Sequence, residues 1–339
     1  MNRVLVPLQL DGAAPVLGAQ AHRFCGETMG TTWQVIFATP ERGVKPGLRA
    51  ALQDELDLVV AQMSTWRPGS DLDRFNRAPA GTWHALAEPF AHVFEAAVWM
   101  ANVSGGAFNP AAGALVNLWG FGPAPRYTDP GFRVPDDPAV QAALARSDWR
   151  ALQWDADLRR AQQPGGVCLD LSAIAKGYAV DRVAQRLADM GLRHTLVEVG
   201  GELRGEGLAL GGQPWWVDLE LPPAVQGAHP LLPTRVALHG LCVATSGDYR
   251  RAYTHNGAIW PHTIDPRHGR PVAHGLASVS VLHEACLWAD AWSTALMVLG
   301  REKGVALAAE HGIAALFVQR EPDGRLTETL TPAMEALAG

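Results

Sequence analysis

The spacing of apolar residues along the chain predicts a series of helices. Residues 47–66, GLRAALQDELDLVVAQMSTW, place Leu48, Leu52 and Leu56 on one helical face. Further helices are predicted over residues 89–105, 140–148 and 175–191, and an apolar run predicts another over residues 289–300. The last of these ends at Gly300, because glycine readily adopts the backbone conformation that terminates a helix.

Strands are predicted where apolar and β-branched residues alternate or form short runs. These segments are residues 31–38, 166–172, 194–207, 214–222, 234–247, 277–285 and 312–319. Residues 120–138 are rich in proline and glycine, which indicates a long loop. Several predicted strands follow one another without a helix between them. An α+β fold with mixed, largely antiparallel sheets and packed helices is therefore favoured over a doubly wound sheet.

The length of the chain bears on its domain organisation. A chain of 339 residues can build one large core or two closely joined ones. We expect a leader over residues 1–23 that is poorly ordered. Residues 24–339 are expected to form a single domain, with two tightly joined α/β subdomains as the alternative.

The predicted helix over residues 289–300, ADAWSTALMVLG, contains an unexpected polar pair. Asp290 and Thr294 are four positions apart, so a helix places them one above the other on the same face. A buried carboxylate is costly unless it caps a helix, accepts hydrogen bonds or binds a cation. The sequence leaves these three explanations open.

Composition and charge narrow the class of protein. Hydrophobic residues make up 48% of the chain and charged residues 18%, which is typical of a folded globular protein. The formal charge of −6 and the absence of a basic run argue against nucleic acid as a partner. The four cysteines are scattered without a CxxC pair, so neither a zinc site nor a redox motif is indicated.

The first residues bear on localisation. Gln9 and Asp11 interrupt the one apolar run of the N-terminal segment, which a secretory signal would need unbroken. No later segment approaches the roughly 20 apolar residues of a membrane-spanning helix. We expect a cytoplasmic protein with no membrane span, or a periplasmic one if the N-terminus is incomplete.

Two segments offer candidate chemistry. In CLDLSAIAKGYAVD, residues 168–181, a predicted strand delivers Asp170 and Ser172 to the start of a helix, where free backbone N–H groups and Lys176 suit a phosphate. A helix cap beside a solvated lysine explains the same residues. In residues 244–271, His262 precedes Asp265 and is a candidate for proton transfer near neutral pH. An ordinary surface or core histidine is the alternative.

Two further segments are less specific. Residues 26–33, GETMGTTW, form a permissive polar loop before a strand, or an ordinary turn. Residues 106–123 combine aromatic and small residues that suit either the wall of a flat ligand or the core. These patterns predict an anion site and an oxygen-ligated cation, but they do not name a reaction.

Eight segments, in this order along the chain, together resemble a known family. They are ETMGTTW, MSTWRPGSDLDRFN, AFNPAAGALVNLWGFGP, DLSAIAKGYAVD, VEVGGELRGEG, ATSGDYRR, HTIDPRHGRP and ADAWSTALMVLG. The family they resemble is the FAD:protein FMN transferase family, also called ApbE. The resemblance covers residues 26–300 and implies an ApbE-like, T-fold-related architecture.

The resemblance implies a magnesium-dependent transferase that uses FAD as a substrate. Such an enzyme splits the pyrophosphate of FAD and joins FMN through a phosphoester bond to a threonine or serine hydroxyl of a target protein, while AMP leaves. The metal ligands it implies are the backbone carbonyl of Ala173 together with Asp290 and Thr294. His262 is implied as the base that removes the hydroxyl proton. Magnesium favours such hard oxygen ligands.

The resemblance also implies contacts with FAD. The implied residues are Met29, Trp66, Ala107, Phe108, Asn109, Asp170, Lys176 and Ile264. This sequence departs from the family in two respects. Asn109 stands where an aspartate is expected, although an amide can still form a hydrogen bond with the ligand. The sequence also shows neither the export signal nor the lipid-anchor cysteine that many family members carry.

Two alternatives to protein flavinylation share this site. An FAD pyrophosphatase would use water in place of the protein hydroxyl and release FMN and AMP. A non-enzymatic FAD-binding protein would hold FAD without turnover and would need neither His262 nor the metal pair.

Overall fold

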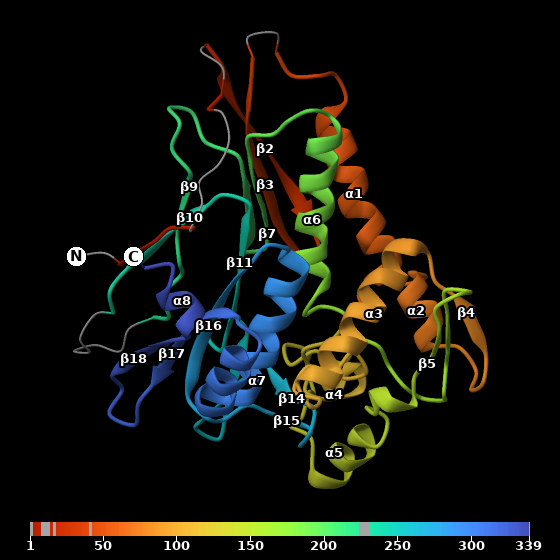
Figure 1. Ribbon diagram of the computed structural model, residues 1–339. Helices are drawn as coiled ribbons and strands as arrows, with labels where there is room; N and C mark the ends of the chain where they lie inside the picture. The colour runs from red at the N-terminus through yellow and green to blue at the C-terminus, as the bar shows by residue number, and fades with distance from the viewer. Residues whose placement is uncertain (1–2, 8–13, 16–17, 41–42, 224–230, 339) are drawn as a thin grey trace.

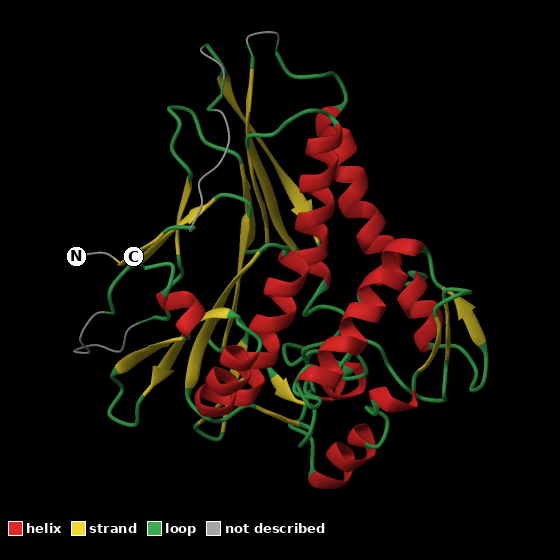
Figure 2. Ribbon diagram, viewed as in Figure 1, coloured by secondary structure: helices red, strands yellow, loops and turns green. Residues whose placement is uncertain are grey.

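The computed structural model describes residues 3–7, 14–15, 18–40, 43–223 and 231–338. Its centre is an eight-stranded sheet (Figures 1 and 2). The strands are β2 (Gln20–Thr28), β3 (Thr31–Thr39), β7 (Thr195–Val199), β8 (Glu202–Glu206), β11 (Leu241–Gly247), β16 (Leu276–His283), β17 (Ala314–Arg320) and β18 (Leu326–Leu330). Their order is β18-β17-β16-β11-β8-β7-β3-β2, and every neighbouring pair is antiparallel.

Helices cover one face of this sheet (Figure 1). They are α1 (Leu48–Met63), α6 (Ala175–Asp189) and α7 (Cys286–Glu310), and α3 (Glu88–Val103) packs against α1 and α7. The opposite face carries a small sheet of order β1-β10-β9 and a short helix. These elements are β1 (Arg3–Leu5), β10 (Thr234–Leu238), β9 (Trp215–Asp218) and α8 (Pro332–Glu335).

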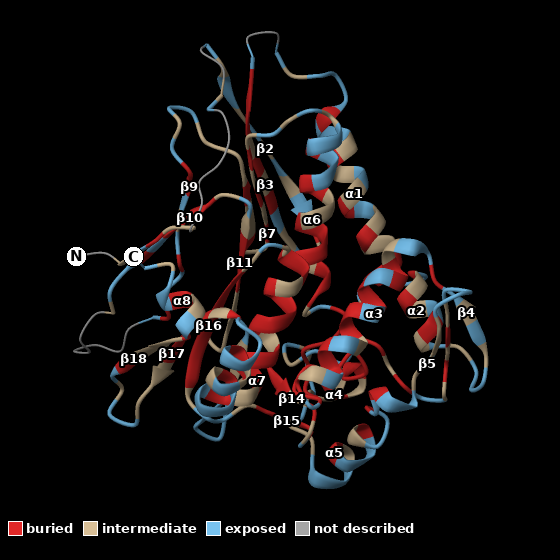
Figure 3. Cartoon of the chain, in the orientation of Figure 1, coloured by how far each residue is buried: buried red, intermediate tan, exposed pale blue. Residues whose placement is uncertain are grey.

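The alternation of side chains along each strand builds a core on both faces of the sheet. In β3, Trp33, Val35 and Phe37 join the large core beneath the helices, whereas Ile36 packs against the smaller core on the other side. Buried strands therefore run through the middle of the molecule in Figure 3. Both faces of the sheet are covered at its centre, which explains why β16 and β17 are buried along most of their length.

Smaller elements lie beyond the edge of the helical layer (Figure 1). They are α2 (Asp71–Asn76), α4 (Gly113–Leu118), α5 (Asp137–Leu144), a 3₁₀ turn (Trp149–Ala151), β4 (Trp83–Ala85), β5 (Gln153–Asp155), β6 (Arg160–Gln162), β12 (Ala252–His255), β13 (Ala258–Pro261), β14 (Ile264–Asp265) and β15 (Arg270–Pro271). The strands among them pair only locally, in the order β4-β6-β5 and as the hairpins β12–β13 and β14–β15. None of the described helices combines the length and apolar character needed to cross a bilayer.

The expected α+β class, with largely antiparallel sheets and packed helices, is confirmed. The predicted helices correspond to α1, α3, α5, α6 and α7, and the long loop over residues 120–138 is present up to the start of α5 at Asp137. The glycine pair Gly200 and Gly201 forms the turn between β7 and β8. Within the expected leader, the structure places β1, and β2 already begins at Gln20. The division of the chain into leader and domain stays a prediction.

The strand predicted over residues 166–172 is wrong. The segment makes one isolated bridge, between Cys168 and Ala112, because its other backbone groups find partners outside any strand. The Asn76 side chain donates to the Leu169 carbonyl at 2.9 Å and accepts from the Leu169 N–H at 2.7 Å. A side-chain amide thus stands in for a neighbouring strand.

Two helix boundaries also differ from the prediction. The helix expected to begin near Ala173 begins at Ala175. Gly300 does interrupt α7, with φ of 78° and ψ of 173°, but a second helical segment continues to Glu310 beyond this kink.

The start of α7 is fixed by a side chain from α6. Asp181 accepts the Cys286 N–H at 3.0 Å with one carboxylate oxygen and the Leu287 N–H at 2.9 Å with the other. These are first-turn amides that have no partner within the helix. A negative charge there is also favourable for the helix dipole. Asp181 therefore sets where α7 begins.

We predict that Asp181→Ala lowers the free energy of unfolding by about 1–3 kcal/mol, because two helix amides and the Arg204 guanidinium lose their acceptor. Chemical denaturation measures the change. Asp189→Ala, on the exposed end of α6, is the control and should shift stability by less than about 0.5 kcal/mol. Equal effects for the two variants would contradict the capping role.

Candidate functional site

The buried carboxylate of Asp290 lies where α7 crosses α6. Asp290 is only 3% exposed, and one of its oxygens accepts the Gly177 N–H at 2.9 Å. This close approach depends on glycine, because a Cβ on Gly177 would lie 2.2 Å from the Cys286 carbonyl oxygen. The glycine lets the two helix backbones come together and aims a backbone donor at the carboxylate.

Lys176 lies between two buried carboxylates. Its ammonium donates to Oε1 of Glu202, which comes from the start of β8, and its Nζ is 3.9 Å from Oδ1 of Asp290. Glu202 is 2% exposed, and its Oε2 has no hydrogen-bond partner among the described residues. One ammonium therefore faces two carboxylates, and the cluster has an excess of negative charge.

Burial and charge shift the pKa values of this cluster in the expected directions. Burial raises the pKa of Glu202 to about 7, although Lys176 acts against the shift. Burial also raises the pKa of Asp290, and here Lys176 and the Gly177 N–H oppose it. Burial alone would lower the pKa of Lys176, but the two carboxylates raise it above its usual range. Lys176 is thus firmly charged.

Hydroxyl groups lie one turn along α7 from Asp290. Thr294, one turn along α7, lies 3.2 Å from the Ser246 hydroxyl, which is also 2.8 Å from the Ser293 hydroxyl. The Gly177 N–H donates to Asp290, and the backbone hydrogen bonds of the described residues include none to the Ala173 carbonyl. That Asp290, Thr294 and the Ala173 carbonyl together hold a metal stays a prediction.

This donor set fits magnesium. All three ligands are hard oxygens, and Mg²⁺ is usually held by one or two carboxylates while substrate phosphates and water complete its shell. No group of three or more histidine, cysteine, aspartate or glutamate side chains suited to a metal exists in the described part of the chain. A cation site here would thus depend on oxygens of a ligand or of water to complete its shell.

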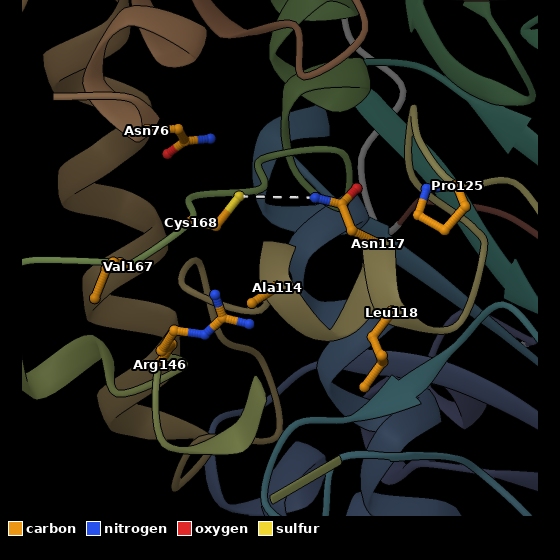
Figure 4. Close-up of a pocket in the computed structure, with 9 residues that line it drawn as sticks. Asn76, Ala114, Asn117, Leu118, Pro125, Arg146, Val167 and Cys168 are labelled. Carbon is orange, nitrogen blue, oxygen red and sulfur yellow. Dashed lines mark hydrogen bonds between the residues drawn. The ribbon is translucent and has the colours of Figure 1, made fainter. Parts of the chain in front are cut away.

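A surface pocket of about 360 Å³ adjoins the loop before α6. Trp66 and Asp170 line it, together with Asn76, Asn117 and Cys168. The last three also line a second pocket of about 410 Å³, shown in Figure 4, in which the Asn117 amide faces the Cys168 thiol. The two pockets are therefore neighbours.

The side chains of the first pocket are suited to binding. The indole of Trp66 is 46% exposed and offers a flat stacking surface. Asp170 accepts the Ser172 N–H at 2.8 Å, so it orders the loop and does not cap α6. Burial, and then the charge of Asp170, raise the pKa of the Cys168 thiol to about 11. Cys168 is therefore neutral near pH 7 and unsuited to act as a nucleophile.

His262 follows β13 and is half-buried. Its Nδ1 lies 3.1 Å from the Arg251 carbonyl oxygen, and its backbone N–H donates to the same oxygen at 2.9 Å. A carbonyl only accepts, so Nδ1 carries the proton of the neutral ring and Nε2 holds the free electron pair. Burial and the nearby Arg251 charge lower the pKa of His262 to about 4. The ring is thus neutral and able to accept a proton.

An aromatic cluster supports His262. The Phe121 ring lies 6.3 Å from the imidazole, edge to face, and the Trp119 and Trp260 rings stack 5.0 Å apart. Ile264 belongs to the same buried cluster. The Arg251 guanidinium lies 6.0 Å from the Trp66 ring, and this contact links the two parts of the site.

Met29 and residues 107–109, which were also predicted to contact FAD, line neither pocket. Met29 occupies the turn between β2 and β3 with φ of 50° and packs against the main core. Ala107 and Phe108 are buried and do not line either pocket. The Asn109 amide donates to the Ser147 carbonyl at 2.7 Å, and its oxygen accepts the Ala111 N–H. Asn109 thus holds its own loop in place, and direct contact of residues 107–109 with FAD stays a prediction.

The ApbE family model matches residues 29–317. The chain belongs to the ApbE family. It is 36% identical to the FAD:protein FMN transferase of Vibrio cholerae serotype O1, over 90% of each chain. It is 34% identical to the FAD:protein FMN transferase of Haemophilus influenzae, over 96% of this chain and 94% of the relative. The resemblance seen in the sequence is therefore confirmed.

Solved structures of the family share the fold. The apo flavinyl transferase ApbE of Pseudomonas stutzeri superimposes with a TM-score of 0.85 at 38% identity, over 96% of this chain and 98% of that one. The flavin transferase ApbE of Vibrio cholerae gives a TM-score of 0.84 at 32% identity, over 94% of this chain and 99% of that one. This family member is therefore a transferase, and the non-enzymatic alternative is set aside.

Three residues next to the site were not singled out in the sequence. Glu202, Ser246 and Asp181 contact Lys176, Thr294 and the start of α7, respectively. The segments that carry them, VEVGGELRGEG, ATSGDYRR and DLSAIAKGYAVD, were all part of the family resemblance. The family resemblance therefore included these residues. Their partners could not be identified, because no spacing within the chain connects the residues of each pair.

We predict that Gly177→Ala destabilises the protein by about 2 kcal/mol or more, because the new Cβ collides with the Cys286 carbonyl. In an open helix the same change would stabilise the protein by up to about 1 kcal/mol. The sign of the change in the free energy of unfolding therefore distinguishes a tight helix contact from an open one. Denaturant unfolding provides the measurement. Gln185→Ala, on the exposed face of α6, is the control and should remain close to wild type. A stabilised Gly177→Ala variant would refute the tight helix contact.

Proposed function

We propose that this ApbE family member transfers FMN from FAD to a threonine or serine hydroxyl of a target protein, in dependence on Mg²⁺ and with release of AMP. The observation that carries the proposal is the buried Asp290 carboxylate beside Lys176, with the Thr294 hydroxyl one turn away. The relatives named FAD:protein FMN transferase over most of this chain support it.

Asp290, Thr294 and the Ala173 carbonyl would hold the Mg²⁺. When bound, it neutralises negative charge on the pyrophosphate that is being split. Lys176 adds a fixed positive charge on the same side, because Glu202 and Asp290 keep its ammonium in place and protonated. The rest of the contribution is positioning of the reacting groups.

The pocket lined by Trp66 and Asp170 is proposed to receive part of the FAD. Trp66 offers an exposed aromatic face to a flat ring, and Met29 and Ile264 are assigned as further contacts. Besides this stacking surface, the polar side chains of Asn76, Arg77 and Asn117 line the pocket and can orient a ligand.

His262 is proposed as the base. The threonine or serine oxygen attacks the FMN phosphorus while the bond between this phosphorus and the bridging oxygen of AMP breaks. The proton of the hydroxyl moves to Nε2 of His262, because Nδ1 faces the Arg251 carbonyl. The products are the phosphoester of FMN with the protein and AMP.

The direct test is mass spectrometry of a candidate target protein co-expressed with this chain. The proposal expects the mass of one FMN, joined as a phosphoester, on a threonine or serine residue. A target that stays unmodified while the relatives modify it under the same conditions would contradict the proposal.

A second measurement separates transfer from hydrolysis. The purified protein is incubated with FAD and Mg²⁺, with and without the target, and AMP is quantified. If the protein transfers FMN, the release of AMP should depend on the target. A pyrophosphatase would release AMP at the same rate without the target.

We predict that Asp290→Ala abolishes Mg²⁺-dependent transfer and leaves the fold largely intact. The variant loses its one charged metal ligand, while Lys176 keeps Glu202 as a partner. Thr294→Val should be milder because a hydroxyl is a weaker ligand and the shape is retained. Transfer rates are measured against Mg²⁺ concentration. Normal turnover of Asp290→Ala at limiting Mg²⁺ would show that the metal assignment is wrong.

We predict that His262→Ala slows transfer by roughly 10²–10⁴-fold, the usual size of general-base catalysis, and changes FAD binding far less. In the wild type the lowered pKa keeps the ring neutral as the pH falls through the ordinary histidine value of about 6.5. The rate should therefore decline only as the pH approaches about 4.

The pH profile is measured at saturating FAD and target, and recovery after return to neutral pH excludes unfolding. Near-normal transfer by His262→Ala would remove His262 from the reaction. Loss of FAD binding in that variant would make it a binding residue instead.

A further inference from the structure

The Glu202 carboxylate is an expensive group to bury, and neither the proposed metal site nor FAD binding uses it. It is 2% exposed, and its Oε2 lacks a hydrogen-bond partner among the described residues. An unpaired carboxylate oxygen in the interior costs free energy unless a nearby positive charge compensates it. Among the described ion pairs, Lys176 is the one cation that contacts Glu202.

Other groups near Glu202 already have partners. The Gly201 N–H donates to Glu198 at 2.7 Å, and Arg250 pairs with Glu220. Oε2 lies against the turn between β7 and β8, where a Cβ on Gly200 would be 3.5 Å from it. The carboxylate is therefore confined, with one oxygen on Lys176 and the other enclosed by the turn.

This arrangement determines which of the two carboxylates accepts the hydrogen bond of the Lys176 ammonium. Nζ forms its hydrogen bond with Glu202 and remains 3.9 Å from Oδ1 of Asp290. Without the charge of Glu202, Asp290 would be the nearest anion, and the lysine would neutralise it directly. Asp290 would then be a poor ligand, because an ammonium would compete with the metal for the same oxygen.

We propose that Glu202 is a positioning residue that holds Lys176 away from Asp290 and so keeps the Asp290 carboxylate available to a divalent cation. This role rests on the proposed function to the extent that Asp290 is a metal ligand. It assigns to Glu202 a task beyond stabilising the fold. It also explains why one ammonium is placed between two buried carboxylates.

Removing the charge of Glu202 and removing the charge of Lys176 should change the affinity for the cation in opposite directions. Glu202→Gln leaves Lys176 and Asp290 to neutralise each other, so cation affinity should fall by about tenfold or more. Lys176→Met removes the competing ammonium, so affinity should rise above that of the wild type. The double variant carries neither charge and should bind the cation about as well as the wild type.

The experiment measures Mn²⁺ binding to the full-length protein without FAD or target, by the loss of the electron paramagnetic resonance signal of free Mn²⁺. Wild type, the two single variants and the double variant are compared, and thermal unfolding establishes that each is folded. Glu206→Gln is the matched control, because Glu206 lies in the same strand and pairs with Arg204 instead of Lys176. Its affinity should equal that of the wild type. Glu202→Asp should restore part of the affinity lost in Glu202→Gln.

The outcomes separate this role from the metal assignment. If Asp290→Asn leaves Mn²⁺ binding unchanged, Asp290 is not a ligand, and this proposal is overturned together with the metal site. If Asp290→Asn abolishes binding but Glu202→Gln binds as the wild type does, only the role of Glu202 is wrong. Should Glu202→Gln fail to fold, the double variant decides, since weak binding by a folded double variant contradicts the proposal.

Discussion

The close contact between α6 and α7 is the constraint on which the site depends. It exists because Gly177 has no side chain, so the Cys286 carbonyl and the Asp290 side chain can approach the backbone of α6. The same contact turns the Gly177 N–H toward Asp290. Asp181 adds a second connection by accepting the first amides of α7. Packing thus fixes the Asp290 carboxylate before any ligand arrives, which is the kind of preorganisation that an electrostatic site requires.

The site then places charge where water is largely excluded. The carboxylates of Glu202 and Asp290 are buried beside the half-buried Lys176, and burial raises the pKa of both carboxyl groups. An excess of negative charge would be a liability in a purely structural cluster, because apolar side chains of the same size would be at least as stable. Its presence is understandable if a cation is bound during the reaction.

The parts of the candidate site that are local in the chain could be predicted from the sequence. Asp290 and Thr294 could be recognised because helical periodicity places them on one face, and that depends only on neighbouring residues. Glu202 and Ser246 could not be found in this way, because they reach the site through β8 and β11, whose pairing is non-local. Residues 166–172 have the pattern of a strand, yet Leu169 pairs with the side chain of Asn76, which lies 93 positions before it. No periodicity reveals a side chain that replaces a strand.

The proposed metal ligands and the proposed base come from different parts of the molecule. Asp290 and Thr294 are fixed by the central sheet and its helices, whereas His262 is held by a loop carbonyl and an aromatic cluster that includes Phe121. Arg251 joins His262 to the pocket, since its carbonyl binds His262 and its guanidinium lies by the Trp66 ring. Stacked aromatic rings give the second part a rigid support of its own. A reaction that joins two large substrates needs an opening between the group that holds one and the group that activates the other. Two separately supported parts can provide this opening without loosening either one.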